Sequence, residues 1–203
     1  MGYYVRVLAK TAEIPTVRRL RERLRTDQLA VNLEVSEGDG DAWIQIVASH
    51  ADGTEICVIE RNPVVPGELG SAELDEFIEE IQGCEPVRAV EWLREYLPSV
   101  KTIYAFQILH KGADQEGGWQ AIHSLQGEIW TTTKGILQAD YEGFSNEEGY
   151  HILWQFSDRV NGLFNMAVRG PEGTWIPFEL DLANVKQREQ FKAGKLPSGA
   201  KLF

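Results

Sequence analysis

Residues 43–61, WIQIVASHADGTEICVIER, decide the fold class of this chain, because they read as two strands joined by a tight turn. Residues 43–48 and residues 55–61 are both rich in Ile and Val, which favour the extended state. Between them, Asp52-Gly53 is a strong signal for a β-hairpin. The stretch therefore predicts an antiparallel pair of strands, and with it a sheet.

The segments on either side of this hairpin add strands and helices. Apolar residues recur at every second position in the strand-like segments, and at three- and four-residue spacing in the helix-like ones. In the last of these helices, Val87, Val90, Leu93 and Leu97 are expected to face inward. We expect an α+β fold in which helices cover one face of an N-terminal sheet; a ferredoxin-like arrangement is one member of that class. The additional strands are expected at residues 2–8, 31–35 and 100–109, and the helices at residues 15–27, 71–83 and 85–97.

The polar, glycine-rich segment 111–118 is the best candidate for a boundary between two halves. Residues 1–112 are then an α+β sandwich-like half, and residues 119–203 a C-terminal antiparallel β-meander with a terminal helix; the two halves are either separate domains or one packed unit. In the second half we expect a short helix at 119–125, strands at 129–133, 135–144, 150–156, 163–169 and 174–180, and a helix at 182–192, followed by an irregular tail.

The chain is acidic, and its charge is unevenly placed. Its formal net charge is −11, but residues 1–30 carry a net +4 and residues 31–203 a net −15. An acidic surface argues against nucleic acid as a partner, since phosphate binding needs a basic footprint. No apolar run is long enough to span a membrane, and residues 1–10 have no apolar signal region. We expect a cytoplasmic protein.

The arginines of the helix predicted at residues 15–27 are the first candidate binding residues. They would form a basic face for an acidic protein, for a phosphorylated ligand or for the acidic part of a second copy, although charge runs of this kind are usually solvated. Trp119, beside Gly117-Gly118, is the tryptophan expected to be most exposed, and exposed aromatic residues mark binding surfaces. The candidate binding residues are Arg18, Arg19, Arg21, Arg23, Arg25 and Trp119.

Catalytic motifs are weak. The four histidines, His50, His110, His123 and His151, have no metal-ligand spacing, although His110 and His123 could converge with an acid such as Asp140. Asp140 and Glu142 would share one face of a strand, which is also typical of an ordinary solvent face. Cys57 lies in an apolar run that disfavours the reactive thiolate, and nothing in the sequence supports a disulfide with Cys84. No phosphate loop, cofactor motif or metal site is expected, and no catalytic residue can be named.

Three functions remain open. The first is a non-enzymatic acidic protein-binding module, for example an inhibitor or immunity-type protein for a basic partner, because complementary charge selects partners and speeds association. The second is a small hydrolase that uses His and Asp or Glu of the C-terminal half; it requires His123 or His151 within hydrogen-bond reach of a carboxylate. The third is self-association, with the basic helix of one copy against an acidic face of another.

Overall fold

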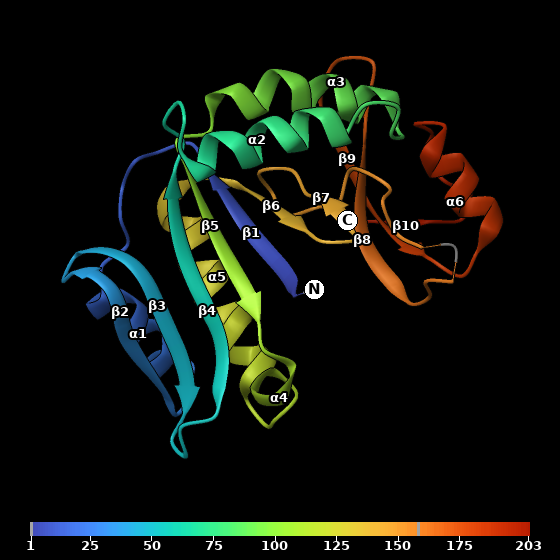
Figure 1. Cartoon of the computed structure of the whole chain (residues 1–203). Helices are drawn as coiled ribbons and strands as arrows, with labels where there is room; N and C mark the ends of the chain where they lie inside the picture. The colour runs from blue at the N-terminus through green and yellow to red at the C-terminus, as the bar shows by residue number, and fades with distance from the viewer. Residues whose placement is uncertain (1, 158) are drawn as a thin grey trace. The chain divides into compact units, whose positions relative to one another are not determined.

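A computed structural model describes residues 2–157 and 159–203 (Figure 1). The chain divides into two compact units, which are interleaved in sequence: the first comprises residues 1–72 and 100–137, and the second residues 73–99 and 138–203. The elements, in chain order, are β1 (Tyr3–Ala9), α1 (Val17–Thr26), β2 (Val31–Asp39), β3 (Ala42–His50), β4 (Glu55–Pro63), α2 (Leu69–Glu80), α3 (Val87–Tyr96), the 3-10 helix η1 (Leu97–Ser99), β5 (Thr102–Ile108), α4 (His110–Ala113), α5 (Gly118–Thr133), β6 (Ile136–Ala139), β7 (Gly143–Phe144), β8 (Leu163–Arg169), β9 (Trp175–Asp181), α6 (Val185–Lys192) and β10 (Lys201–Leu202).

The first unit is built on an antiparallel sheet in the order β2-β3-β4-β5-β1. The predicted hairpin forms β3 and β4, with Ile46 opposite Ile59 and Ala48 opposite Cys57. β5 then lies between β4 and β1, so that Phe106 is opposite both Ile59 and Val5. β5 is therefore an interior strand of this sheet, and its residues are buried from Thr102 to Phe106.

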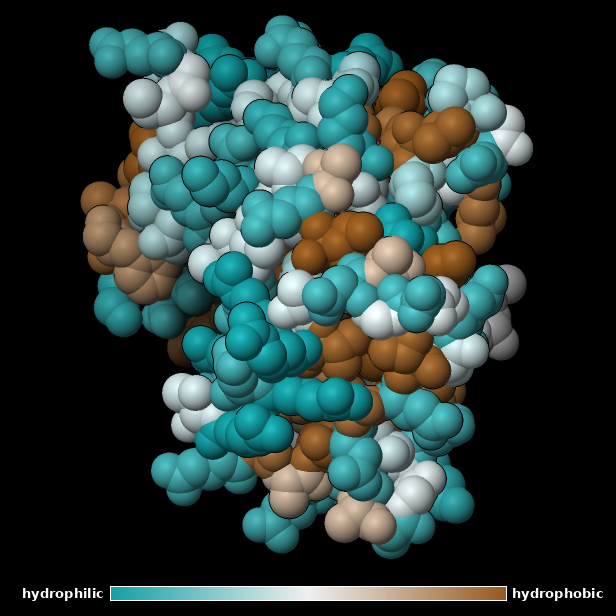
Figure 2. Space-filling view, turned by 90° about the vertical axis from the view of Figure 1, so that its left-hand side faces the viewer, coloured by the Kyte–Doolittle hydropathy of each residue, from teal (hydrophilic) through white to brown (hydrophobic). Residues whose placement is uncertain are grey.

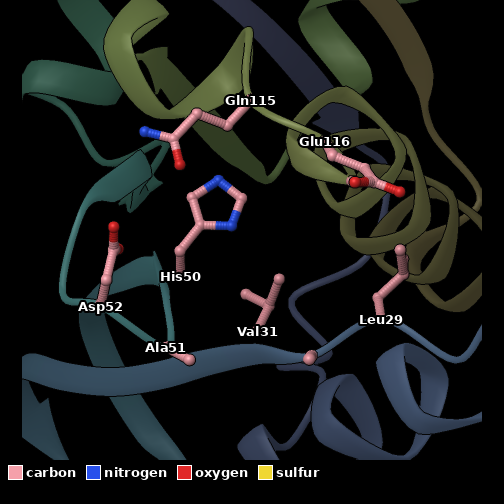
Figure 3. Close-up of a pocket in the computed structure, with 9 residues that line it drawn as sticks. Leu29, Val31, His50, Ala51, Asp52, Gln115 and Glu116 are labelled. Atoms are coloured by element: carbon pink, nitrogen blue, oxygen red, sulfur yellow. The ribbon is translucent and has the colours of Figure 1, made fainter.

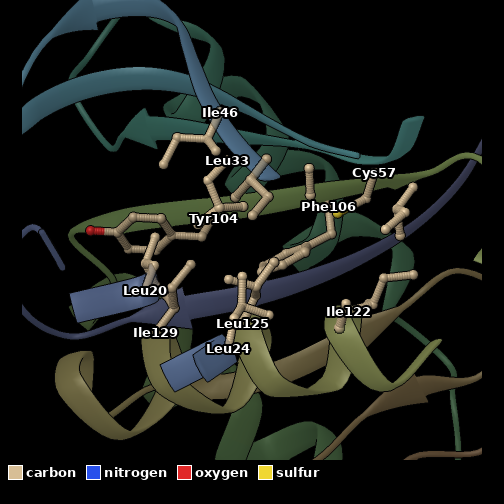
Figure 4. Packing of buried hydrophobic residues seen from close by; sticks show 14 of the residues in the cluster. Leu20, Leu24, Leu33, Ile46, Cys57, Tyr104, Phe106, Ile122, Leu125 and Ile129 are labelled. Atoms are coloured by element: carbon tan, nitrogen blue, oxygen red, sulfur yellow. The ribbon is translucent and has the colours of Figure 1, made fainter. Parts of the chain in front are cut away.

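Helices α1 and α5 cover one face of this sheet and enclose its core (Figure 4). α1 contributes Leu20 and Leu24, which are almost fully buried. The sheet contributes inward-facing side chains such as Tyr104 and Phe106, which lie between the strands and the helices. α5 presents a long apolar stripe, because its residues Ala121, Ile122, Leu125 and Ile129 recur at helical spacing.

The second unit contains the smaller sheet, in the order β10-β9-β8, and the helices α3 and α6. Its core is aromatic. Phe178 of β9 lies 6.3 Å from Phe191 of α6, measured between ring centroids, and Trp154 lies 5.2 Å from Phe156 in the same way. On the α3 side, Trp92 meets Trp175 edge to face at 5.3 Å. Such edge-to-face pairs add to the stability that apolar burial already gives.

The predicted α+β class is confirmed, with one seven-stranded and one three-stranded sheet. The β8–β9 hairpin and the terminal helix α6 are found where the sequence indicated them. Helices do cover one face of the N-terminal sheet, but they are α1 and α5, whereas α3 and most of α2 belong to the second unit. The compact units follow a different division from the expected 1–112 and 119–203, because the segment 73–99 belongs with the C-terminal residues. β6 begins in one unit and ends in the other.

Four local predictions are wrong. Residues 129–133 are the end of α5 rather than a strand, since Ile129 continues the buried stripe and Thr133 Oγ1 donates to the Ile129 carbonyl. Residues 150–156 form isolated bridges rather than a strand, and β6 ends before Asp140, so that Asp140 and Glu142 lie in a turn. Val87, predicted to face inward, is 65% exposed because it opens α3.

The short helix α4 packs closely on β4, and this contact depends on one glycine. A Cβ atom on Gly112 would lie 2.1 Å from the Glu55 carbonyl oxygen, a distance that real Cβ atoms do not reach. α5 begins equally close, because a Cβ on Gly118 would lie 2.4 Å from the Gly112 carbonyl oxygen. The segment predicted as a polar linker is therefore a packed corner of the first unit.

We expect Gly112→Ala to lower the free energy of unfolding by about 1–3 kcal/mol, because the added methyl overpacks α4 against the β4 backbone. Gly127→Ala is the matched control: it lies inside α5, and its Cβ would meet nothing within 4 Å. This control should be neutral or stabilising by up to about 1 kcal/mol, since alanine is the better helix former. Urea denaturation measures both variants, and equal stability of the two would contradict the close packing.

Candidate binding pocket and charged surfaces

The first unit contains a pocket of about 330 Å³ between the β3–β4 turn and the α4–α5 loop (Figure 3). Its floor and sides come from three chain segments that are far apart in sequence. The lining residues are Leu29, Ala30, Val31, His50, Ala51, Asp52, Gln115, Glu116 and Gly117. Asp52, Gln115 and Glu116 are exposed, so the polar rim is accessible to solvent.

His50, the last residue of β3, lies in the middle of the pocket. Its Nε2 atom is 2.9 Å from the Gly112 carbonyl oxygen. Because a carbonyl only accepts hydrogen bonds, Nε2 must carry the proton in this contact. The neutral imidazole then has its lone pair on Nδ1, and His50 offers an acceptor from that atom. Gly112 thus has two roles: its close approach to Glu55 positions α4, and its carbonyl sets the tautomer of His50.

The other polar side chains of the pocket also have oxygen atoms that can accept further hydrogen bonds. The side-chain amide nitrogen of Gln115 donates to the Lys111 carbonyl at 3.2 Å. The side-chain oxygen of Gln115 takes no part in that bond. Asp52 accepts the backbone N–H of Thr54 through Oδ1 at 2.9 Å. This backbone bond and a second one from the Thr54 side chain lower the pKa of Asp52, so the carboxylate stays ionised. Glu116 makes no side-chain hydrogen bond or ion pair within residues 2–157 and 159–203.

The remaining wall of the pocket is apolar. Leu29 follows the C-terminal end of α1, where its N–H bonds to the Leu24 carbonyl at 2.9 Å. Val31 opens the edge strand β2, and both side chains pack against the core of the first unit. Sequence reasoning missed this site, because it treated Asp52-Gly53 only as a turn and residues 111–118 only as a linker. The available signal was a His and an Asp on one tight turn.

The arginines of α1 are mostly engaged within their own unit. Arg19 forms an ion pair with Glu128 of α5. Arg23 Nε donates to Asp27 at 2.9 Å, and the same carboxylate oxygen accepts Ser124 Oγ at 2.6 Å. In the described part of the chain, the side chains of Arg18 and Arg25 alone among the five candidate arginines make neither a hydrogen bond nor an ion pair. The basic helix therefore serves first to hold α1 on α5 and on the sheet.

Arg21 protects the free edge of the sheet. β2 is the outermost strand and has β3 as its one neighbour in the sheet order. Arg21 Nη2 donates to the Leu33 carbonyl of this strand at 2.8 Å. An exposed strand edge is a template for pairing with another chain, and a charged side chain placed on it blocks that pairing. The view in Figure 2, from the side where β2, β3 and α1 lie, shows hydrophilic side chains interleaved with apolar ones.

Trp119 lies in a row of rings on the surface of the first unit. Its ring centroid is 6.3 Å from that of His110 and 6.2 Å from that of His123. Trp119 Nε1 donates to Asp114 at 3.0 Å, and the side chain is partly buried against the core. His110 and His123 thus flank Trp119 rather than a metal. Within residues 2–157 and 159–203, no group of three or more His, Cys, Asp or Glu side chains is arranged to hold a metal ion.

His151 is a buried structural residue of the second unit. Its Nε2 is 2.8 Å from the Glu142 carbonyl oxygen, and its ring centroid lies 4.8 Å from that of Phe156. Burial lowers the pKa of His151 to about 4, which keeps the imidazole neutral near pH 7. Cys57 is similarly inert, since burial raises the pKa of its thiol to about 12. Both cysteines are free thiols.

The most acidic helix described is α2, whose residues from Glu73 onward belong to the second unit. Residues 69–80 of α2 contain five carboxylates and no Lys or Arg. Asp75, Glu76 and Glu79 are exposed, and their carboxylates make no hydrogen bond or ion pair with any residue that the structure describes. Over the described residues, no helix is long and apolar enough to cross a membrane.

Arg21→Met should increase self-association, because it removes the guanidinium that covers the Leu33 carbonyl but keeps most of the apolar stem. The lost hydrogen bond should also cost about 1 kcal/mol of stability. Arg18→Met, on the same helix but without a bond in the described structure, is the control. Sedimentation velocity at matched concentrations measures both. Identical monomer fractions for the two variants would show that Arg21 does not guard the edge.

His151 should make the protein sensitive to mild acid. A histidine with a depressed pKa in the folded state stabilises the fold fully above its unfolded pKa of about 6.5 and loses that contribution as the pH falls toward about 4. The loss is about 3 kcal/mol in total. His151→Gln, which can still donate to the Glu142 carbonyl, should flatten the pH dependence of unfolding between pH 6.5 and 4. Parallel curves for the variant and the wild type would contradict this.

No family model matches the sequence, and no solved structure matches the fold.

Proposed function

We propose that the protein is a non-enzymatic acidic binding module for a basic protein partner. The observation that carries this proposal is the unequal use of the two kinds of charge. Three of the five α1 arginines are bonded within the first unit, whereas Asp75, Glu76 and Glu79 of α2 have no partner among the described residues. The carboxylates that remain available on the surface favour a partner of opposite charge, which they would attract and orient.

The charge of each unit points the same way. The first unit carries a net −3 and the second a net −8, so neither offers a basic footprint for nucleic acid. An inhibitor or immunity-type protein that covers a basic toxin or nuclease is the most concrete version of this function. Of the described histidines, His151 is a buried structural residue, His110 and His123 pack beside Trp119, and His50 lines the pocket of the first unit.

The hydrolase alternative finds less support in the geometry. It requires His123 or His151 near a carboxylate. His151 is bonded to a backbone carbonyl inside an aromatic cluster, and His123 contacts Trp119. The one described histidine–carboxylate pair, His110 with Asp114, is 4.0 Å apart and solvent-exposed, and a nucleophile beside it is not evident. Self-association between α1 of one copy and α2 of another would bring opposite charges together. However, three of the five α1 arginines are already bonded within their own unit.

The test is retention of a partner from an extract of the source cells on the immobilised protein at low and at high salt. We expect a basic protein to be retained at about 50 mM salt and released at about 500 mM, because screening weakens charge pairs at the surface. The triple variant Asp75→Asn, Glu76→Gln, Glu79→Gln should lower the association rate by roughly 10-fold.

The matched control neutralises three other exposed acids, Glu34→Gln, Glu37→Gln and Asp39→Asn, on β2. It changes the net charge equally but leaves α2 intact. Absence of any partner at low salt would contradict the proposal, as would equal loss of binding in the two triple variants. Light scattering of the protein alone across the same salt series separates partner binding from self-association.

A further inference from the structure

We propose that the pocket between the β3–β4 turn and the α4–α5 loop of the first unit binds an alkyl cation, namely the lysine or arginine side chain of a protein partner. This inference names the part of the partner that is recognised and, for the source of the ligand, rests on the proposed function. The pocket itself is argued from its own contacts.

The polar side chains that line the pocket offer mostly acceptors, since Asp52 and Glu116 are carboxylates and the donor of the neutral His50 ring is already bonded. The Nε2 proton of His50 is committed to the Gly112 carbonyl, which leaves the Nδ1 lone pair. The side-chain amide nitrogen of Gln115 donates to the Lys111 carbonyl, and its side-chain oxygen is free to accept. Asp52 and Glu116 are acceptor-only groups when ionised. A ligand that brings several donors and no acceptor fits this set, and ammonium and guanidinium groups are such ligands.

Charge selects the same class of ligand. Asp52 and Glu116 carry the two formal charges of the lining, and Figure 3 shows them on opposite sides of the His50 ring. Lining that contains no Lys or Arg would repel an anion and attract a cation. A neutral polar ligand would leave both carboxylates without a counter-charge.

The shape and the apolar wall account for the alkyl part. Leu29 and Val31 lie on the side of His50 opposite to Asp52 in Figure 3, and both are partly buried. The stems of lysine and arginine cover apolar surface while their charged ends seek polar groups. A volume of about 330 Å³ is at the small end of ligand pockets, which suits one side chain rather than a large cofactor.

Hydrogen bonds hold His50 and the β3–β4 turn in place. His50 is held by Gly112, and the β3–β4 turn is closed by the His50 N–H to Thr54 carbonyl bond at 2.9 Å. A second bond closes the same turn: the Gly53 N–H donates to the His50 carbonyl, with 3.0 Å between nitrogen and oxygen. Acceptors that are already oriented lose less entropy when a ligand binds.

The first experiment titrates n-butylammonium into the labelled protein and follows the amide shifts of Asp52 and Glu116 by NMR. We expect saturable shifts with a dissociation constant of about 1 mM, as is reasonable for a ligand of this size. n-Butanol, which has the same stem without the charge, should bind at least about 10-fold more weakly. Equal binding of the amine and the alcohol, or no binding of the amine, would overturn the site.

Two variants at one position isolate the acceptor atom. His50→Gln can keep a donor toward the Gly112 carbonyl but removes the acceptor at Nδ1, and it should weaken butylammonium binding about 10-fold. His50→Asn keeps an acceptor near the Nδ1 position and should bind more tightly than His50→Gln. The control Glu37→Gln neutralises an exposed acid of β2 that does not line the pocket, and it should bind as the wild type does. If Glu37→Gln lowers the affinity as much as His50→Gln does, the attraction is general charge and the site is refuted.

The source of the cation is tested separately with short peptides. Peptides that contain one lysine or one arginine should compete with butylammonium, whereas the matching norleucine peptide should not. Failure of both cationic peptides while butylammonium still binds would overturn the assignment to a protein side chain. The failure of the proposed function is distinguishable from these outcomes: butylammonium and the cationic peptides would bind, but no basic partner would be retained at low salt.

Discussion

The close contact between α4 and the backbone of β4 is the constraint on which the pocket of the first unit depends. It exists because residue 112 has no side chain, and a single methyl there would collide with the Glu55 carbonyl. The same residue provides the carbonyl that orients His50. Gly112 therefore permits the close approach of α4 to β4 and also fixes which nitrogen of the neutral imidazole carries the proton. Packing and recognition chemistry share a single cause.

The two signs of charge have different uses in this protein. Arginine combines a long apolar stem with a forked donor, so it can cover the helix α1 and still reach the Leu33 carbonyl or the Glu128 carboxylate. The shorter acids of α2 have no comparable reach, and Asp75, Glu76 and Glu79 stay in solvent. The sequence alone shows one basic helix in an otherwise acidic chain. The contacts show which of these charges are available to a partner.

The sequence predicted the strands β1 to β5 and the helix α1 of the first unit well, because the hairpin at residues 43–61 and the apolar spacing around it are local signals. The end of α5 was predicted as a strand, because the β-branched Ile129 and the threonines at 131–133 favour the extended state. In the fold, burial of Ile129 against the sheet outweighs this local preference. The pocket could not be predicted. His50 and Gln115 are far apart in the chain, and only the fold of the first unit brings them together. The glycines that permit this contact, at 112, 117 and 118, look in the sequence like those of any loop.

The tautomer of His50 tests the acceptor pocket most directly. Long-range nitrogen–proton correlation NMR on nitrogen-15-labelled protein, at a pH where the ring is neutral, identifies which ring nitrogen carries the proton. His50 is predicted to carry it on Nε2, with an unprotonated Nδ1 whose signal shifts when an alkylammonium ligand is added. A proton on Nδ1, or an Nδ1 signal that does not respond to the ligand, would contradict the claim that this pocket is built to accept hydrogen bonds from a cation.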